Sequence, residues 1–374
     1  MSSEPRSSPP PPGSEQEKAL STAIQKIIGS AFRSSVKGKR KYDKENMLPE
    51  ELSLHDYGRR YARMGEIFEH ISTVADTGIK YDTADSDADD EVSEMDRQLT
   101  DGWNLLCNMI PRFRMDMMTV QPDRRAFKKV LSLVEDGILR TRSDDTAGLK
   151  FRILAYLNLD HTLPVEPAII HASTKSDRGW AHPVTARLLC PLEYPATRAT
   201  YDMIEAGAII ITAKNYPRFL YPDDRVYDPK DVETGLLMGH VMLRVAKHIL
   251  QGPSASLERP GFHRGKRGNA SIMGVTSVTP RIIAYLAVQA RFAMTQASSW
   301  SVIDAHFDYN LFYWQIVGLF DDGEGADIIA HYNLQVFGSG SPVPQTPDAP
   351  PSPPSDLEIL KAQRAAKRAR LAVE

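Results

Sequence analysis

Apolar residues recur at intervals of three and four positions along most of this chain, which is the pattern of helices that bury one face. Six runs show it: residues 54–75, 95–110, 127–138, 238–249, 283–294 and 303–317. Strand-like patterns are confined to residues 150–157 and 208–212. The predicted fold class is therefore mainly α: a single helical domain with a minor β element, flanked by disordered tails.

Proline and acidic residues set the limits of the folded region. Five of the 26 prolines lie in the first 12 residues, and seven lie between Pro342 and Pro354. Such segments favour extended, solvated backbone. Residues 82–94 carry seven acidic and no basic side chains, which predicts an exposed acidic loop.

These limits divide the chain into five predicted parts. They are a disordered, basic N-terminal region with one amphipathic helix (1–48), a helix with a heptad-like seam (49–81), the acidic loop (82–94), a helical core domain (95–338), and a proline-rich linker with a basic C-terminal helix (339–374).

The helix predicted over residues 49–81 has an apolar seam of about three heptads. Two interpretations are open: the helix packs on the chain's own core, or it pairs with a second copy. Self-association would use Leu54, Tyr57, Tyr61, Met64, Phe68 and Ile71.

The overall composition excludes several classes of protein. The chain has 374 residues, a formal net charge of −3 and only two cysteines, Cys107 and Cys190. Two cysteines cannot supply a disulfide framework or a zinc site of three or four thiolates. The N-terminal sequence has no apolar run typical of a signal peptide, and no apolar stretch reaches membrane-spanning length. We therefore expect an intracellular protein without membrane association.

The sequence contains no familiar catalytic or phosphate-binding motif, neither G-x-S-x-G nor G-x-x-x-x-G-K-[ST]. Asp304, His306 and Asp308 form the most metal-like string, because carboxylate and imidazole suit several divalent cations. No second compact ligand group accompanies this string, so we predict no metal and no cofactor. An enzyme with a site around His182, Asp304 and His306 is an alternative, and whether the chain is an enzyme stays open.

Two basic clusters lie toward the ends of the chain. Short cationic runs of this kind engage nuclear-import receptors or the phosphates of nucleic acid. We therefore predict a nuclear location, with the cytoplasm as the alternative, and nucleic acid or a nuclear protein as partner. The predicted contact residues are Lys37, Lys39, Arg40, Lys41, Lys361, Arg364, Lys367, Arg368 and Arg370.

A further set of polar residues could contact an anion. One group lies in a basic, glycine-containing loop at residues 259–267, and the other lies between residues 178 and 187. The open alternatives are a solvated surface for the loop and hydrogen bonds to backbone carbonyls for the other group. The candidate residues are Arg178, His182, Arg187, Arg264, Lys266 and Arg267.

The segment RGWAHPVTARLLCP, from Arg178 to Pro191, resembles a motif of an uncharacterised protein family, a domain of unknown function expanded in mushroom-forming basidiomycete fungi. Three later strings support the resemblance by their order and spacing: YPRFLY from Tyr216, AYLAVQARF from Ala284 and FDYNLFY from Phe307. The family has no established activity, so the resemblance implies no catalytic residue. The predicted function is a non-enzymatic nuclear interaction protein. The alternatives are the enzyme described above and a cytosolic dimeric scaffold.

Overall fold

The computed structural model describes residues 22, 24–26, 29, 52–84, 92–257 and 268–338 and confirms a mainly helical fold with a minor β element. The helices and strands are, in chain order, α2 (Leu54–Tyr61), α3 (Ile71–Asp82), α4 (Glu94–Met109), α5 (Phe113–Val120), α6 (Arg124–Arg152), α7 (Pro183–Leu189), α8 (Arg198–Glu205), α9 (His240–Leu250), α10 (Asn269–Ile272), α11 (Pro280–Met294), β1 (Ile303–Asp304), β2 (Phe307–Asp308), α12 (Tyr309–Gly318) and α13 (Ala326–Phe337). None of the helices in these ranges is long and apolar enough to cross a membrane.

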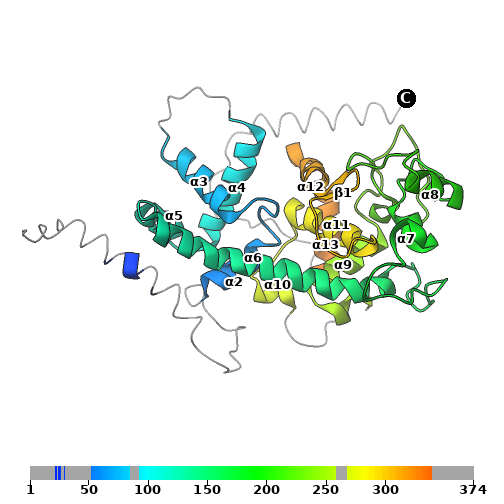
Figure 1. Cartoon of the computed structure of the whole chain (residues 1–374), viewed down its shortest axis with the longest axis horizontal. Helices are drawn as coiled ribbons and strands as arrows, with labels where there is room; N and C mark the ends of the chain where they lie inside the picture. Colours follow the sequence, from blue (N-terminus) through cyan, green and yellow to red (C-terminus); the bar gives the residue numbers. More distant parts are fainter. Residues whose placement is uncertain are drawn as a thin grey trace, which may run out of the picture.

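Helix α6, 29 residues long, connects two hydrophobic cores. The Asp123 side chain caps it by accepting hydrogen bonds from the backbone N–H groups of Arg125 and Ala126. The first half of α6 packs into an N-terminal core with α2, α3, α4 and α5, whereas Leu149 near its end belongs to a second core. Figure 1 shows α6 running from the side of α3 and α5 to the side of α7 and α9.

Helix α2 crosses α6 at close range because both helices carry glycine at the crossing. A Cβ atom on Gly58 would lie 2.1 Å from the carbonyl oxygen of Val134, and one on Gly137 would lie 2.1 Å from that of His55. Real Cβ atoms do not approach oxygen so closely, so any larger residue at either position would push the helices apart. The two glycines therefore fix the spacing between α2 and α6.

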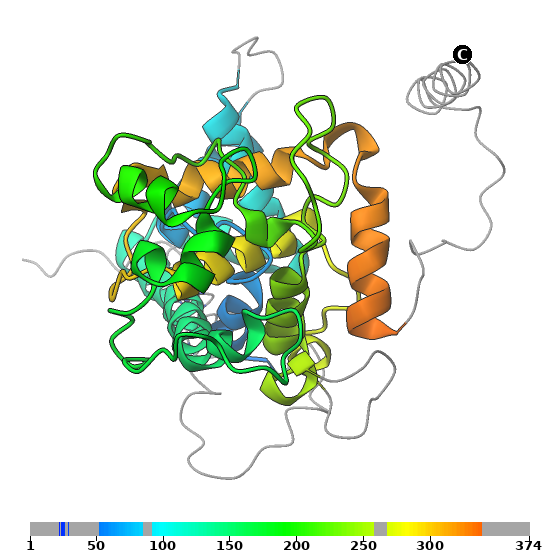
Figure 2. The ribbon, with the colours of Figure 1, turned by 90° about the vertical axis from the view of Figure 1, so that its right-hand side faces the viewer.

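Helix α11 lies at the centre of the second core. Thr279 caps it and Pro280 occupies its first turn, and both residue types suit these positions. Residues 282–294 are all buried, as expected for a helix surrounded by other elements. Helices α9 and α12 pack directly on α11. Figure 2 shows α13 as the upright orange helix beside this core, where the Tyr332 hydroxyl donates to the carbonyl of Leu237 at 2.6 Å.

The single helix predicted over residues 49–81 is wrong, because residues 62–70 separate α2 from α3. In this turn the carboxylate of Glu66 accepts hydrogen bonds from the backbone N–H groups of the next two residues, at 2.8 and 2.7 Å, and so replaces helical bonds. Tyr57, Tyr61 and Ile71 are buried in the N-terminal core. These three seam residues therefore pack inside the chain, as in the first of the two interpretations.

Most of the acidic loop predicted at residues 82–94, residues 85–91, lies outside the described ranges, and its two end residues belong to helices. Asp82 ends α3 and accepts hydrogen bonds from Trp103, at 2.7 Å, and from Arg114. Glu94 begins α4, where a carboxylate is favoured by the helix dipole. Asp82 and Glu94 therefore stabilise the ends of two helices.

Residues 150–157 and 208–212, where strands were expected, lie within the described ranges but form no strand. Residues 150–152 continue α6, and Ile153–Tyr156 form a 3₁₀ turn, because residues 149, 153 and 156 bury one helical face. The β element is instead a hairpin in which Ile303 pairs with Asp308. At the N-terminus, Ile24 is buried in the N-terminal core, so the predicted amphipathic helix contacts the fold.

Candidate functional site

A cavity of about 530 Å³ lies between α2, α6, α9 and α10, where the two cores approach each other. Junctions of this kind are frequent ligand sites in proteins. Its charged and imidazole-bearing lining residues are His55, Asp56, Arg59, Arg60, Arg63, Asp144, Asp145 and His248. Arginine and aspartate are equally represented, so the lining is close to neutral overall.

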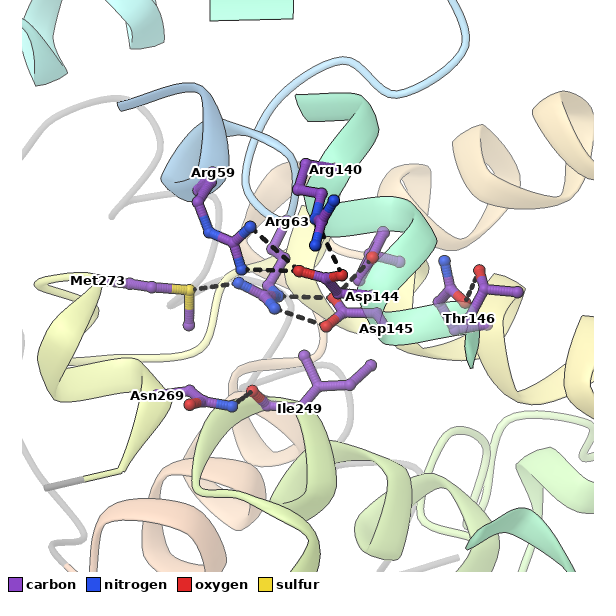
Figure 3. A network of polar contacts seen from close by, with 11 residues as sticks. Arg59, Arg63, Arg140, Asp144, Asp145, Thr146, Ile249, Asn269 and Met273 are labelled. Carbon is purple, nitrogen blue, oxygen red and sulfur yellow. Dashed lines mark hydrogen bonds and ion pairs between the residues drawn. The ribbon is translucent and has the colours of Figure 1, made fainter. Parts of the chain in front are cut away.

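A buried ion pair between Arg63 and Asp145 forms the centre of this lining (Figure 3). The Nε atom of Arg63 donates to one carboxylate oxygen at 2.7 Å, and a terminal nitrogen donates to the other at 2.5 Å. The Tyr285 hydroxyl, from α11, donates to the same carboxylate at 2.8 Å. Burial alone would lower the pKa of Arg63, but Asp145 outweighs it and the pKa is raised. Arg63 therefore stays charged, and the pair with its tyrosine partner joins α6 to α11 and to the turn after α2.

A second ion pair lies one residue away and faces solvent. Both terminal nitrogens of Arg59 donate to Asp144 at 3.1 Å, and the Nε atom of Arg140 lies 3.3 Å from the other carboxylate oxygen. The Asp144 side chain is 43% exposed, compared with 9% for Asp145. Solvent screens exposed pairs, so this outer pair contributes little stability.

His248, on α9, also lines the cavity. Its Nδ1 atom lies 2.8 Å from the Tyr156 hydroxyl, and burial lowers its pKa to about 4. The imidazole is therefore neutral at pH 7. Gly148 makes room for the ring, because a Cβ atom there would lie 3.1 Å from Nε2.

The chemistry of the cavity is that of a balanced polar network. The carboxylates of Asp144 and Asp145 are both held by guanidinium groups, and the imidazole is neutral. The part of the chain that the structure describes contains no group of three or more His, Cys, Asp or Glu residues that could hold a metal ion. The arrangement joins secondary-structure elements and offers no activated nucleophile.

The candidate anion-binding residue Arg178 is instead bound to backbone carbonyls. Its side chain is fully buried and donates to Ala293 at 2.6 Å, to Ala172 at 2.9 Å and to Lys150. This is the second alternative left open by the sequence, and it corrects the anion assignment for Arg178. Because one of these carbonyls, that of Ala293, lies in the last turn of α11, the guanidinium helps to cap the C-terminal end of this helix.

Lys175 lies beside Arg178 and caps the same end of α11, although the sequence did not single it out. Its Nζ atom donates to the carbonyls of Phe292, at 2.5 Å, and Ala297, at 2.6 Å. Burial, and secondarily the charge of Arg178, lower its pKa to about 7. Two buried cations therefore satisfy the last carbonyls of the central helix.

His182 and Arg187 also have partners inside the fold. Nδ1 of His182 accepts the backbone N–H of Val184 and so caps α7, while Nε2 lies 2.7 Å from the carbonyl of Pro167. Arg187 donates to Asp223 at 3.1 Å. These contacts give both side chains polar partners within the fold, without a bound anion.

The enzyme site considered around His182, Asp304 and His306 is not assembled. His306 is exposed at the tip of the β hairpin, and Asp304 lies 3.5 Å from Arg291. Among the described residues no contact joins His182 to either of them. Asp308, the third member of the metal-like string, caps α12 by accepting two backbone N–H groups.

The remaining predicted contact residues lie outside the described ranges. They are Lys37, Lys39, Arg40, Lys41, Arg264, Lys266, Arg267, Lys361, Arg364, Lys367, Arg368 and Arg370.

Sequence reasoning missed the buried ion pair, although one signal was present. Asp145 falls on the buried face of α6, in line with Ile138, Thr141 and Leu149 at helical spacing. An acidic residue at such a position requires a buried partner. The identity of that partner, Arg63, could not be read from the pattern, because it lies 82 residues away.

Comparison with known proteins relates the second core to a protein family. A family model described as "Family of unknown function (DUF6698)" matches residues 136–337, from within α6 to the end of α13. The searches of curated proteins and of solved structures gave no match. The matched range contains Asp145 and His248 but not Arg63.

Proposed function

We propose that this chain, which belongs to the DUF6698 family of unknown function, is a non-enzymatic nuclear interaction protein. Its basic segments, residues 37–44 and 361–370, would contact nucleic acid or a nuclear partner. The observation that supports the proposal is that the cationic side chains of the fold are largely bound to partners within it.

The arginines of the described residues are largely held by partners inside the fold. Arg142, Arg178, Arg218 and Arg244 donate to backbone carbonyls, and Arg63, Arg114 and Arg187 pair with carboxylates. A guanidinium that already donates to a carbonyl or carboxylate has fewer N–H groups for a phosphate. The folded region is therefore poorly suited to follow a nucleic-acid backbone.

The distribution of charge along the sequence supports the same proposal. Residues 52–338 contain 31 basic and 37 acidic side chains, whereas residues 1–51 contain nine basic and seven acidic ones. Residues 361–370 contain five basic side chains and no acidic one. Phosphates would be repelled by the middle of the chain and attracted to these short segments. Binding of this kind is weak, tolerant of sequence and steeply dependent on salt.

The binding test compares three cations of the C-terminal cluster with three exposed cations of the fold. We expect the triple variant Lys367→Ala, Arg368→Ala, Arg370→Ala to lose most of the affinity for unrelated duplexes and single strands, measured by fluorescence anisotropy at two salt concentrations. The control triple variant is Lys128→Ala, Lys214→Ala, Lys230→Ala, whose side chains are exposed. It removes the same charge and should bind nearly as well as the original chain. Equal losses in both variants would contradict the proposal.

The location is tested separately in cells. A fluorescent fusion of the full chain should accumulate in nuclei. Replacing Lys39, Arg40, Lys41, Lys367, Arg368 and Arg370 together by alanine should make it diffuse, because both clusters lose their charge. An unchanged nuclear signal in this variant would show that the two clusters do not direct the protein to the nucleus.

A further inference from the structure

A groove of about 340 Å³ lies between the turn at residues 66–69, the start of α4 and the start of α12. We name it the acidic groove. It is lined by the acidic residues Glu66, Glu69, Glu94 and Asp308, the apolar residues Met95, Leu99, Leu311 and Trp314, and the amides Gln98 and Asn310. No basic side chain is among these lining residues.

The apolar part of the acidic groove is open to solvent. Met95 is 51% exposed and Leu311 is 42% exposed, although both are large apolar side chains. An exposed apolar surface with a polar rim is a common mark of an interaction site. Glu66 and Asp308 accept backbone N–H groups of the fold, so the acidic character of the rim comes mainly from Glu69 and Glu94. The surface therefore fits a partner that combines apolar and basic side chains.

Arg281 lies beside the acidic groove, and its charge acts on the buried carboxylate of Glu66. The guanidinium of Arg281 lies 4.8 Å from the centre of the Trp314 ring, and its side chain is only 15% exposed. In the sequence, Glu94 follows closely on residues 85–91, which add five acidic side chains and no basic one. The charge around the start of α4 is therefore strongly negative.

We propose that the acidic groove is the docking site of this chain's own C-terminal segment, residues 356–371. The segment reads DLEILKAQRAAKRARL and contains five basic residues. Leu357, Leu360, Arg364, Lys367 and Leu371 follow one another at intervals of three and four, which places leucines and cations on one helical face. Such a face matches an apolar floor between carboxylates, as in other helix-in-groove complexes.

The chain between the fold and this segment is long enough to reach the acidic groove. Helix α13 ends at Phe337, and residues 339–355 form the connection. Seventeen residues in the extended conformation that proline favours span about 50 Å. A compact region of this size has a radius of gyration of about 19 Å, so a connection of that length can reach most of its surface.

Docking would regulate the proposed function, on which this part of the inference rests. The cations that pair with the groove carboxylates are the same ones that would contact phosphates. Nucleic acid and the acidic groove therefore compete for residues 361–370, and loss of the groove charges should strengthen nucleic-acid binding.

The test uses the full chain with a photo-crosslinking amino acid, benzoylphenylalanine, in place of Leu360. Cross-links mapped by mass spectrometry at low salt should fall within residues 94–99 or 308–314. The double variant Glu69→Gln, Glu94→Gln should reduce them several-fold. The control Asp136→Asn, Asp224→Asn removes two exposed charges elsewhere and should leave them unchanged.

Mixing isotopically labelled and unlabelled copies distinguishes docking within one chain from docking between chains. Cross-links within one copy support the proposal, whereas cross-links between copies, or scattered over other surfaces, would overturn it. Because this readout needs no nucleic acid, it tests docking even if the proposed function fails. If both hold, the Glu69→Gln, Glu94→Gln variant should bind nucleic acid several-fold more tightly than the control variant.

Discussion

Replacing Asp145 by alanine should lower the free energy of unfolding by about 3–5 kcal/mol, the usual effect of removing one partner of a buried ion pair. The Arg63 side chain is only 7% exposed, so its charge would stay buried without a counter-ion. The Tyr285 hydroxyl would also lose its acceptor. That second loss is worth about 1–3 kcal/mol by itself, but it overlaps with the first and is not added to it.

Asp144 offers a matched control on the same turn of α6. It has the same charge and also accepts from arginine, but its side chain is 43% exposed. Asp144→Ala should therefore cost no more than about 1 kcal/mol. The double variant Arg63→Met, Asp145→Leu removes both buried charges and should recover most of the stability lost in Asp145→Ala.

The assay is urea unfolding of the full chain, followed by far-ultraviolet circular dichroism. The midpoint for Asp145→Ala should fall well below that for Asp144→Ala, while the slope of the transition stays the same. If the two single variants differ by less than about 1 kcal/mol, burial does not set the strength of these pairs and the reasoning fails.

Three further predictions concern other buried positions. In urea unfolding, Gly58→Ala should destabilise the fold by about 1–3 kcal/mol, because its Cβ atom would lie 2.1 Å from the Val134 carbonyl oxygen. The helical control Gly318→Ala should be near neutral in the same assay, because its Cβ atom would lie no closer than 3.6 Å to any neighbouring atom. The pKa of His248 falls to about 4 on folding, so the unfolded chain binds more protons between pH 4 and 6.5 and stability should drop as the pH falls through this window. The loss should approach about 3 kcal/mol, and a His248→Gln variant that keeps the same pH dependence would contradict the assignment. The pKa of Lys175 falls to about 7, so stability should rise between pH 7 and 10 in the original chain, and Lys175→Met should flatten that rise in unfolding curves taken at several pH values.

The sequence by itself determined where most helices form, because helical periodicity and capping are local properties. Thr279 and Pro280 mark the start of α11, and Asp123 marks the start of α6, because each residue stabilises the first turn of the helix that begins beside it. The apolar faces of α4, α9 and α11 could likewise be read from spacing alone. The same pattern did not reveal the break at residues 62–70, because the bonds made there by Glu66 leave no trace in hydrophobic periodicity.

Tertiary structure decided which polar residues are buried and what they bind. Helical spacing can place Asp145 on the buried face of α6 and Asp144 outside it, but only the fold supplies Arg63 and Tyr285 as the partners of the buried carboxylate. Arg178 was a candidate anion-binding residue in the sequence, but in the fold one of its carbonyl partners is Ala293 at the end of α11, 115 positions away. Hydrogen-bond partners come from elements that meet only after folding, so local spacing cannot specify them.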